Sequence, residues 1–319
     1  MKINKKDVKI PADVPKDMMN EYADNFLLAT KNSGRLMLFA GDQKIEHLND
    51  DFVGKTKEGM DISADDADPE HFFKIASSGT IGCFAGQLGL VARYGRDYPD
   101  VPYLIKMNSK TGLINVKQKD PISQTLYDFE DVLELKHNSG LNIIGIGYTI
   151  YLGSEFDYMM MQEAARLATW AHQNGMLAIF WMYPRGEAVE AEKDPHLIAG
   201  AAGVALSLGA DFAKVNYPNK KGLDEKGRAK AFKEATVAAG RTGIITSGGS
   251  ARDVKVFLQE TYDQIHISGC SGNATGRNIH QKDFDEAVRM CNAISAITIG
   301  NHDVEFAYKV YKGDEKFKV

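Results

Sequence analysis

The sequence predicts a single (β/α)8 barrel, or TIM barrel, over residues 1–319, with an N-terminal extension and helix over 1–34. Three observations lead to this fold class. Short apolar segments alternate with segments of helical periodicity, as in parallel βα units. The apolar segments are nearly continuous, as expected for strands buried on both faces. Eight such units follow one another without a linker, and eight can close into a barrel. A doubly wound open sheet is the alternative.

Composition and charge narrow the possible functions. The chain carries 38 Lys and Arg against 43 Asp and Glu, and this balance argues against nucleic acid or an anionic membrane as a partner. No apolar run reaches the ~18 residues of a membrane span, and no apolar core follows the basic N-terminus, so we expect no secretory signal. The cysteines, Cys83, Cys270 and Cys291, lack metal-ligand spacing, which indicates reduced thiols in the cytoplasm and no metal site.

The first half of the chain begins with a helix, predicted over 15–30 from the spacing of its apolar residues and ended by Gly34. The first strand, 36–40, is followed by a long polar loop over 49–68, a length that suggests a function and possible mobility. Its acidic run, 65–68, lacks the pattern of a calcium loop and predicts a solvated turn. The next predicted elements are helix 69–78, strand 81–86, helix 89–96, strand 103–107, helix 126–137 and strand 142–151.

The second half repeats the alternation of strands and helices. A long helix over 155–173 precedes the fifth strand, and a helix of small residues over 195–208 precedes the sixth. The eighth strand is predicted at 264–268, with His266 as a structural residue inside it. The other predicted elements are strands 176–183, 212–215 and 243–246 and helices 226–239, 251–262 and 281–297.

Lys214, near the end of the sixth strand, is the candidate on which the predicted site depends. Its neighbours Phe212, Ala213 and Val215 are apolar, so the amine either reaches out of the strand or loses its solvation. Desolvation lowers the pKa of an amine and makes it a nucleophile toward carbonyls. Lys214 is therefore a candidate Schiff-base lysine. A lysine that extends from a strand end into solvent is the alternative.

Two glycine-rich loops follow the last two predicted strands, at the end of the barrel that holds active sites. Ser250 is a candidate N-cap of the helix after the first loop, and free backbone N–H groups at such a turn bind phosphate. Barrel phosphate sites often use these two loops, and two ordinary glycine turns are the alternative. The candidate phosphate ligands are Ser247, Gly248, Gly249, Gly276 and Arg277.

Two residues at strand ends are candidates for acid–base work. Asp42 ends the first strand and Tyr151 ends the fourth. A carboxylate or a tyrosine beside a cationic amine can transfer protons during cleavage of a carbon–carbon bond. The alternatives are an aspartate that caps a turn and a tyrosine that fills the rim. Glu46 and His47 follow Asp42 closely and belong either to the pocket or to a surface loop.

Two further cations lie at strand ends: Lys106 near the end of the third strand and Arg185 just after the fifth. Each could bind a second phosphate, or could lower the pKa of Lys214 by repulsion between like charges. Charge at the barrel mouth without a specific role is the alternative.

Six segments, in this order, resemble the archaeal-type class I fructose-bisphosphate aldolases, the DhnA-like family. They are residues 39–47, 147–154, 183–186, 210–214, 247–249 and 276–279. The resemblance covers most of the chain. It implies a Schiff-base lyase that reversibly cleaves fructose 1,6-bisphosphate into dihydroxyacetone phosphate and glyceraldehyde 3-phosphate in glycolysis and gluconeogenesis. It also implies a homo-oligomer that acts on a phosphorylated sugar without a metal or other cofactor.

The resemblance assigns Lys214 to the Schiff base, Tyr151 to proton transfer at the enamine, and Asp42 to acid–base work. The phosphate cradle corresponds to Gly248, Gly249, Gly276 and Arg277. The family usually shows Asp-His-Gly after the first strand, whereas this chain has Asp42-Gln43-Lys44. A transaldol enzyme of the same family, 2-amino-3,7-dideoxy-D-threo-hept-6-ulosonate synthase, is one alternative. A sugar-phosphate-binding barrel without catalysis is another.

Overall fold

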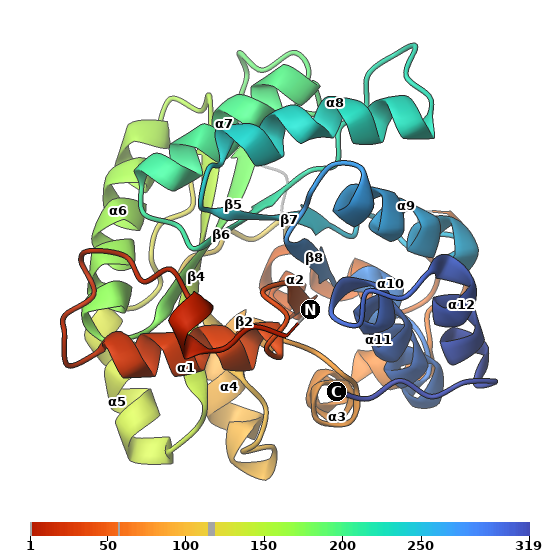
Figure 1. The fold of residues 1–319 in the computed structure, drawn as a ribbon, viewed down its shortest axis with the longest axis horizontal. Helices are drawn as coiled ribbons and strands as arrows, with labels where there is room; N and C mark the ends of the chain where they lie inside the picture. The colour runs from red at the N-terminus through yellow and green to blue at the C-terminus, as the bar shows by residue number, and fades with distance from the viewer. Residues whose placement is uncertain (1, 57, 114–118) are drawn as a thin grey trace.

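A computed structural model describes residues 2–56, 58–113 and 119–319. In these ranges eight parallel strands close into a barrel in sequence order, with β8 paired to β1 (Figure 1). The predicted fold class is confirmed. The strands are β1 Leu36–Ala40, β2 Cys83–Gln87, β3 Tyr103–Lys106, β4 Ile143–Leu152, β5 Leu177–Pro184, β6 Phe212–Val215, β7 Gly243–Ser247 and β8 Gly272–Thr275.

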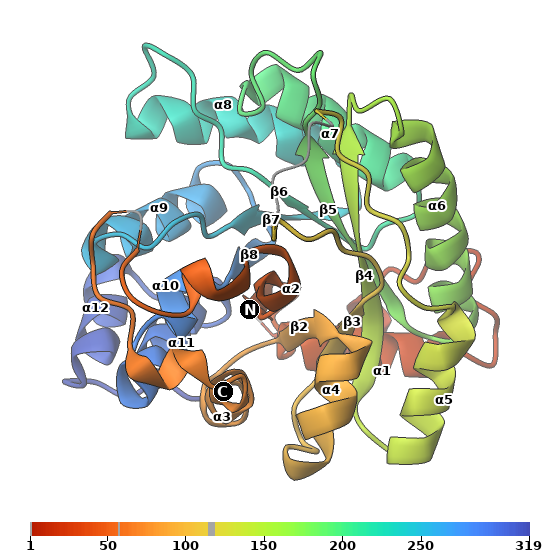
Figure 2. The same ribbon diagram turned by 180° about the vertical axis from the view of Figure 1, so that it is seen from behind.

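Helices surround the barrel, most of them as a ring outside the strands (Figures 1 and 2). They are α1 Met19–Thr30, α2 Gln43–Glu46, α3 Glu70–Ser78, α4 Leu88–Tyr94, α5 Phe129–Ser139, α6 Asp157–Gln173, α7 Pro195–Ser207, α8 Glu225–Ala238, α9 Val254–His266, α10 Arg277–His280, α11 Phe284–Thr298 and α12 Val304–Lys312. The short helices α2 and α10 and the C-terminal α12 were not predicted. Each long helix has a polar outer face and an inner face whose aliphatic and aromatic side chains are buried against the strands.

The barrel interior is a separate apolar cluster, because side chains on a strand alternate between its two faces. On β5, Leu177, Ile179 and Trp181 point inward, and on β6 Phe212 does. Two positions after Phe212, Lys214 lies on the same face, one step nearer the carboxyl ends of the strands. The alternation that fills the core with apolar groups therefore places the amine at the barrel mouth.

The N-terminal helix α1 closes the opposite end of the barrel. The ring of Phe26 stacks on that of Phe212 with 5.7 Å between centroids, and Tyr22 packs with the same interior cluster. Figure 1 shows α1 lying in front of the strands, whereas Figure 2 shows α2 and the opposite end. The helix begins at Met19, a little later than predicted, after a turn over 16–18.

The prediction for the eighth strand was wrong. Residues 264–266, His266 included, belong to α9, and β8 is the polar segment Gly272–Thr275. Gln264 and Ile265 are buried because they lie on the inner face of the helix. In β8 the amide of Asn273 donates to Thr298 Oγ1 at 2.8 Å, so a strand that lacks an aliphatic run is still fully packed. The helix α9 begins at Val254 with Asp253 as its N-cap, so the predicted cap at Ser250 was also wrong.

The segment 48–68, which we call the β1 loop, is anchored by four buried residues, Asp51, Phe52, Ile62 and Asp66, whereas residues 53–55 and 58–61 are exposed. It contains short 3-10 helices at Leu48–Asp51 and Ala64–Ala67. Asp66 is only 1% exposed, and His280 Nδ1 lies 2.7 Å from its carboxylate. The predicted solvated turn was therefore wrong at Asp66, because its partner comes from a helix 214 positions later in the chain.

No helix in the described ranges combines the length and the hydropathy that crossing a bilayer requires.

Candidate active site

A cavity of about 540 Å3 opens at the carboxyl ends of the strands. Every predicted site residue lines it except Tyr151 and Lys106. The predicted residues on its wall are Asp42, Arg185, Lys214, Ser247, Gly248, Gly249, Gly276 and Arg277. Because the carboxyl ends of parallel strands meet at one face of a barrel, residues from five strand ends come together there.

Lys214 is the buried amine of this cavity. The residue is 5% exposed, and its Nζ lies 5.1 Å from the centroid of the Trp181 ring. Burial lowers the pKa of the Lys214 amine, and the positive charge of Arg277 adds to this, whereas Asp42 and Glu46 act in the opposite direction. A lowered pKa leaves more of the amine neutral near pH 7, which is the form that attacks carbonyls.

Lys106 lies beside the cavity rather than on its wall. Its ammonium donates to Thr149 Oγ1 at 2.7 Å and to the side-chain oxygen of Asn108 at 3.0 Å, and it lies 5.1 Å from the same Trp181 ring. A Cβ at Gly147 would stand 2.7 Å from Trp181, so this glycine makes room for the indole. Burial lowers the pKa of Lys106 to about 8.

Asp42 is 7% exposed and faces the cavity. It precedes α2, but its side chain makes no capping hydrogen bond, and no described group contacts its Oδ1. The alternative of an aspartate that only caps a turn is therefore not what the structure shows. A buried carboxylate oxygen without a partner can accept a hydrogen bond from a ligand hydroxyl, or the proton of that hydroxyl.

Two tyrosines are neighbours on β4 and β5, since Tyr151 pairs with Tyr183 in the register and their ring centroids are 6.5 Å apart. The hydroxyl of Tyr151 donates to Glu46 Oε1 at 3.0 Å. Tyr183, not Tyr151, lines the cavity. Arg185 makes paired hydrogen bonds to Glu192 at 3.0 and 3.1 Å, so its charge is partly compensated at the rim.

The two glycine-containing loops lie next to each other at the cavity wall. Asn278 Nδ2 donates to the Gly248 carbonyl at 3.1 Å and so joins the two loops. Gly249 has a φ of 69°, which favours glycine, and no described group accepts a hydrogen bond from its N–H. Together with the guanidinium of Arg277, this open donor suits an anion.

Trp181, Tyr183 and Asn216 were missed by the sequence analysis, although all three line the cavity. Ser247 Oγ lies 3.3 Å from Asn216 Oδ1, which ties the ends of β6 and β7 together. The signal was the two-residue period: Trp181 and Tyr183 continue the inward face of β5, and Asn216 continues the face that holds Lys214.

A desolvated lysine beside a carboxylate and an anion-binding turn, at the mouth of a (β/α)8 barrel, has the features of a lysine-dependent aldolase. A family model described as DeoC/LacD family aldolase matches residues 36–282. The chain belongs to this family.

Named relatives span nearly all of the chain. The chain is 58% identical over 315 residues to a protein of Methanocaldococcus jannaschii named fructose-bisphosphate aldolase/6-deoxy-5-ketofructose 1-phosphate synthase. The match covers 99% of this chain and 98% of that protein. A solved structure described as fructose-bisphosphate aldolase from Slackia heliotrinireducens has a TM-score of 0.95, with 53% identity over 100% of this chain and 98% of that one.

A more distant solved structure is an archaeal fructose-1,6-bisphosphate aldolase described with its catalytic Lys covalently bound to the carbinolamine intermediate of the substrate. It is 29% identical to this chain, with a TM-score of 0.71, and the match covers 88% of this chain and 100% of that one.

Proposed function

We propose that this chain is a class I fructose-bisphosphate aldolase that cleaves fructose 1,6-bisphosphate reversibly. The observation that carries the proposal is Lys214, an amine that is 5% exposed on the wall of a cavity that also holds the two anion-binding loops. The names of the relatives support the same substrate. A cytoplasmic location and a homo-oligomeric assembly stay predictions.

The first half of the reaction forms an imine. The neutral amine of Lys214 attacks the C2 carbonyl of the ketose, and the carbinolamine loses water to give an iminium ion. The C4 hydroxyl then gives up its proton, and Asp42 is the group that we propose as its acceptor. The C3–C4 bond breaks, its electron pair moves toward the iminium nitrogen, and glyceraldehyde 3-phosphate leaves.

The second half regenerates the enzyme. The enamine takes a proton at C3, and water hydrolyses the resulting iminium to release dihydroxyacetone phosphate and the free amine. Tyr151 was predicted to transfer this proton, but its hydroxyl is engaged with Glu46. Tyr183 lines the cavity with Lys214, so we propose Tyr183 as the group that touches the substrate and Tyr151 as its support.

The loops after β7 and β8 are proposed to hold a phosphate ester. The open N–H of Gly249 and the guanidinium of Arg277 supply the donors. Ser247, Gly248 and Gly276 form the adjoining wall. Arg185 stands across the cavity and is a candidate for the second phosphate, in exchange with Glu192.

The experiment that tests the function is mass spectrometry of the intact chain after incubation with fructose 1,6-bisphosphate and borohydride. Reduction of the imine should leave a stable adduct that maps to the peptide with Lys214. The variant Lys214→Met should show neither the adduct nor turnover. If the wild-type chain carries no adduct at Lys214, the proposal is wrong.

A second candidate function comes from the other activity in the name of the Methanocaldococcus jannaschii relative, 6-deoxy-5-ketofructose 1-phosphate synthase. The relative's 58% identity over 99% of this chain favours it over the transaldol alternative. Both activities in that name concern a ketose 1-phosphate, which the same lysine and cradle could serve. Assaying the two reactions with one preparation would separate them, and loss of both in Lys214→Met would assign them to one site.

A further inference from the structure

The β1 loop brings a carboxylate to the edge of the anion-binding loops. Asp51 is 8% exposed, and its Oδ2 contacts His47 Nδ1 on one side and lies 3.7 Å from Arg277 Nη1 on the other. His47 and Arg277 both line the cavity, whereas Asp51 does not. One buried carboxylate thus contacts two cavity residues that come from opposite ends of the chain.

Asp51 is negatively charged in this position. Burial alone would raise the pKa of its carboxyl, but the hydrogen bond from His47 and the charge of Arg277 outweigh burial and lower it. A charged acceptor favours the tautomer of His47 that carries its proton on Nδ1, which leaves Nε2 free. It also attracts the guanidinium of Arg277.

The backbone of Asp51 is fixed by the helix that follows β8. The side-chain amide of Gln281 donates to the Asp51 carbonyl at 2.8 Å, and the Ser63 N–H donates to the Gln281 carbonyl at 3.0 Å. The neighbouring Phe52 ring stacks on His280 with 5.0 Å between centroids. The carboxylate therefore stands on a rigid support and is not the tip of a free loop.

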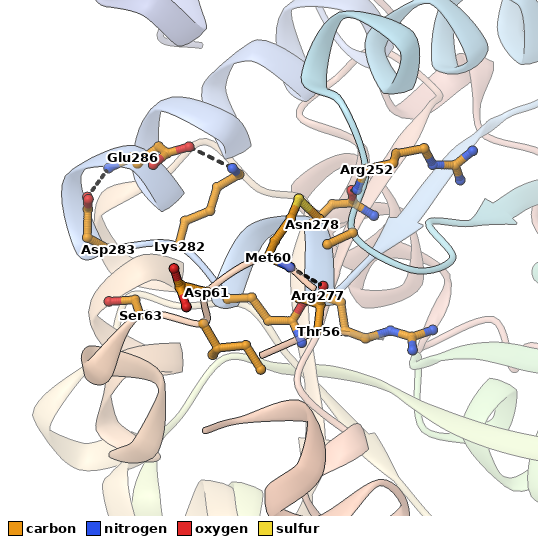
Figure 3. A pocket seen from close by; sticks show the side chains of 13 residues that line it. Thr56, Met60, Asp61, Ser63, Arg252, Arg277, Asn278, Lys282, Asp283 and Glu286 are labelled. Atoms are coloured by element: carbon orange, nitrogen blue, oxygen red, sulfur yellow. Dashed lines mark hydrogen bonds and ion pairs between the residues drawn. The ribbon is translucent and has the colours of Figure 1, made fainter. Parts of the chain in front are cut away.

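Arg277 has few other partners. Its side chain is 19% exposed, and its Nε has no hydrogen-bond partner among the described residues. Of the described carboxylates, only that of Asp51 lies within ion-pair distance of its guanidinium. Figure 3 shows its guanidinium pointing away from Asp61, Asp283 and Glu286, which together with Arg277 line a second cavity of about 310 Å3. Among the described residues, Asp51 is thus the acidic group placed to orient this side chain.

We propose that Asp51 is a positioning residue for the phosphate cradle: by holding Arg277, with His47 at its other side, it aims the guanidinium at the phosphate ester of the substrate. The inference rests on the proposed function, since it assumes that a phosphorylated ketone reaches Lys214. Asp51 itself does not touch the substrate. Its role is to keep a desolvated cation in one orientation before the anion arrives.

The test measures imine formation with two ketones that differ only in phosphate. The chain is equilibrated with dihydroxyacetone phosphate or with dihydroxyacetone, then reduced with borohydride, and the modified fraction is followed against ketone concentration. Asp51→Ala should raise the half-saturating concentration of the phosphate ester about tenfold, the effect of losing one charge-assisted hydrogen bond from a misdirected Arg277 to the phosphate. The value for dihydroxyacetone should not change.

Two further variants make the result specific. Asp51→Asn keeps the shape and one acceptor for His47 but removes the charge, so it should give an intermediate shift and serve if Asp51→Ala does not fold. Asp61→Ala removes a carboxylate of the same loop that pairs with Lys55 at the surface, and it should behave as wild type.

The possible outcomes are distinct. If the wild-type chain forms no imine with dihydroxyacetone phosphate, the proposed function fails. If it does, and Asp51→Ala and Asp51→Asn leave the half-saturating concentration unchanged or lower, the inference about Asp51 is wrong. Equal shifts with both ketones would also overturn it, because they would indicate general damage to the site.

Discussion

At the scale of single residues, the site depends on where a side chain lies as much as on what it is. Tyr151 and Tyr183 are paired across two strands, yet only Tyr183 lines the cavity. Burial raises the pKa of the Tyr183 hydroxyl, and the carboxylates of Asp42 and Glu46 raise it further. A tyrosine held neutral in this way can donate a proton to a carbon that develops negative charge.

Removal of the two hydroxyls separates these roles. We expect Tyr183→Phe to lower kcat for cleavage by about 100-fold or more, the usual contribution of a positioned acid–base group, while an imine can still be trapped. We expect Tyr151→Phe to lower kcat less than tenfold, because it loses one hydrogen bond to Glu46. Steady-state kinetics and borohydride trapping of both variants provide the measurement, and the reverse order would restore Tyr151 to the direct role.

The charged residues that sequence analysis identified on the cavity wall share a position in the fold. Asp42, Lys214 and Arg277 are charged and lie at or just after the carboxyl end of a strand, and the rule that barrel sites lie there was enough to find them. Trp181 and Tyr183 were missed because aromatic residues on a buried strand have the same pattern as core residues. Asp51 could not be found, since its contact with Arg277 is made by a helix that only folding brings near.

At the scale of elements, strand β6 is anchored below Lys214 by a buried polar group. Asp211 precedes the strand, and its carboxylate accepts hydrogen bonds from the Ala178 N–H at 2.8 Å and from the hydroxyl of Tyr22 in α1. His172 lies between Asp211, at 3.2 Å, and Asp13, at 2.8 Å. This group joins the N-terminal segment, α6 and β6.

The charge of His172 gives this anchor a pH dependence. Burial lowers the pKa of the imidazole, but its bonds to Asp211 and Asp13 more than offset this and raise the pKa to about 9. A raised pKa in the folded state stabilises the fold below about pH 6.5, and the stabilisation is lost as the pH rises through about 9. The contribution amounts to about 3 kcal/mol at most.

Urea unfolding of the wild type and of His172→Gln at pH 6, 7.5 and 9.5 measures this contribution. The difference in unfolding free energy between the two chains should be largest at pH 6 and should shrink at pH 9.5. Because both chains contain the other groups that titrate in this range, such as Lys106, the contributions of those groups cancel in the difference between the two unfolding free energies. A difference that stays constant with pH would show that His172 is neutral in the folded chain.

The eighth strand shows the limit of reading elements from sequence. The other seven strands have aliphatic runs or glycine-rich apolar runs, and their predicted positions agree with the structure to within a few residues. The segment Gly272–Thr275 has neither, and it is a strand because β1 and β7 leave an unpaired edge that its backbone fills. The local pattern of apolar residues does not reveal a strand that forms because barrel closure requires one at that position.

At the scale of the whole molecule, the two ends of the barrel differ. One end is closed by α1, and the other collects charged and polar groups of both signs. Groups of three or more His, Cys, Asp or Glu with metal-ligand geometry do not occur in the described ranges. In the proposed reaction the protonated imine accepts the electron pair of the broken bond, which is the task that a metal performs in other aldolases.

We therefore expect an excess of EDTA to leave kcat for fructose 1,6-bisphosphate cleavage unchanged after prolonged incubation. A matched sample treated with borohydride and substrate should lose all activity. Loss of activity in EDTA that a divalent cation restores would contradict a reaction that relies on Lys214 alone.

The bonds between the β1 loop and α10 cross the seam where the last strand meets the first. During synthesis, Lys214 is made before Arg277, which completes the phosphate cradle. Until then the amine would sit in an open sheet without its phosphate-binding partner. Completion of the barrel therefore also completes the proposed phosphate site, and a bound sugar phosphate would link elements from both sides of that seam.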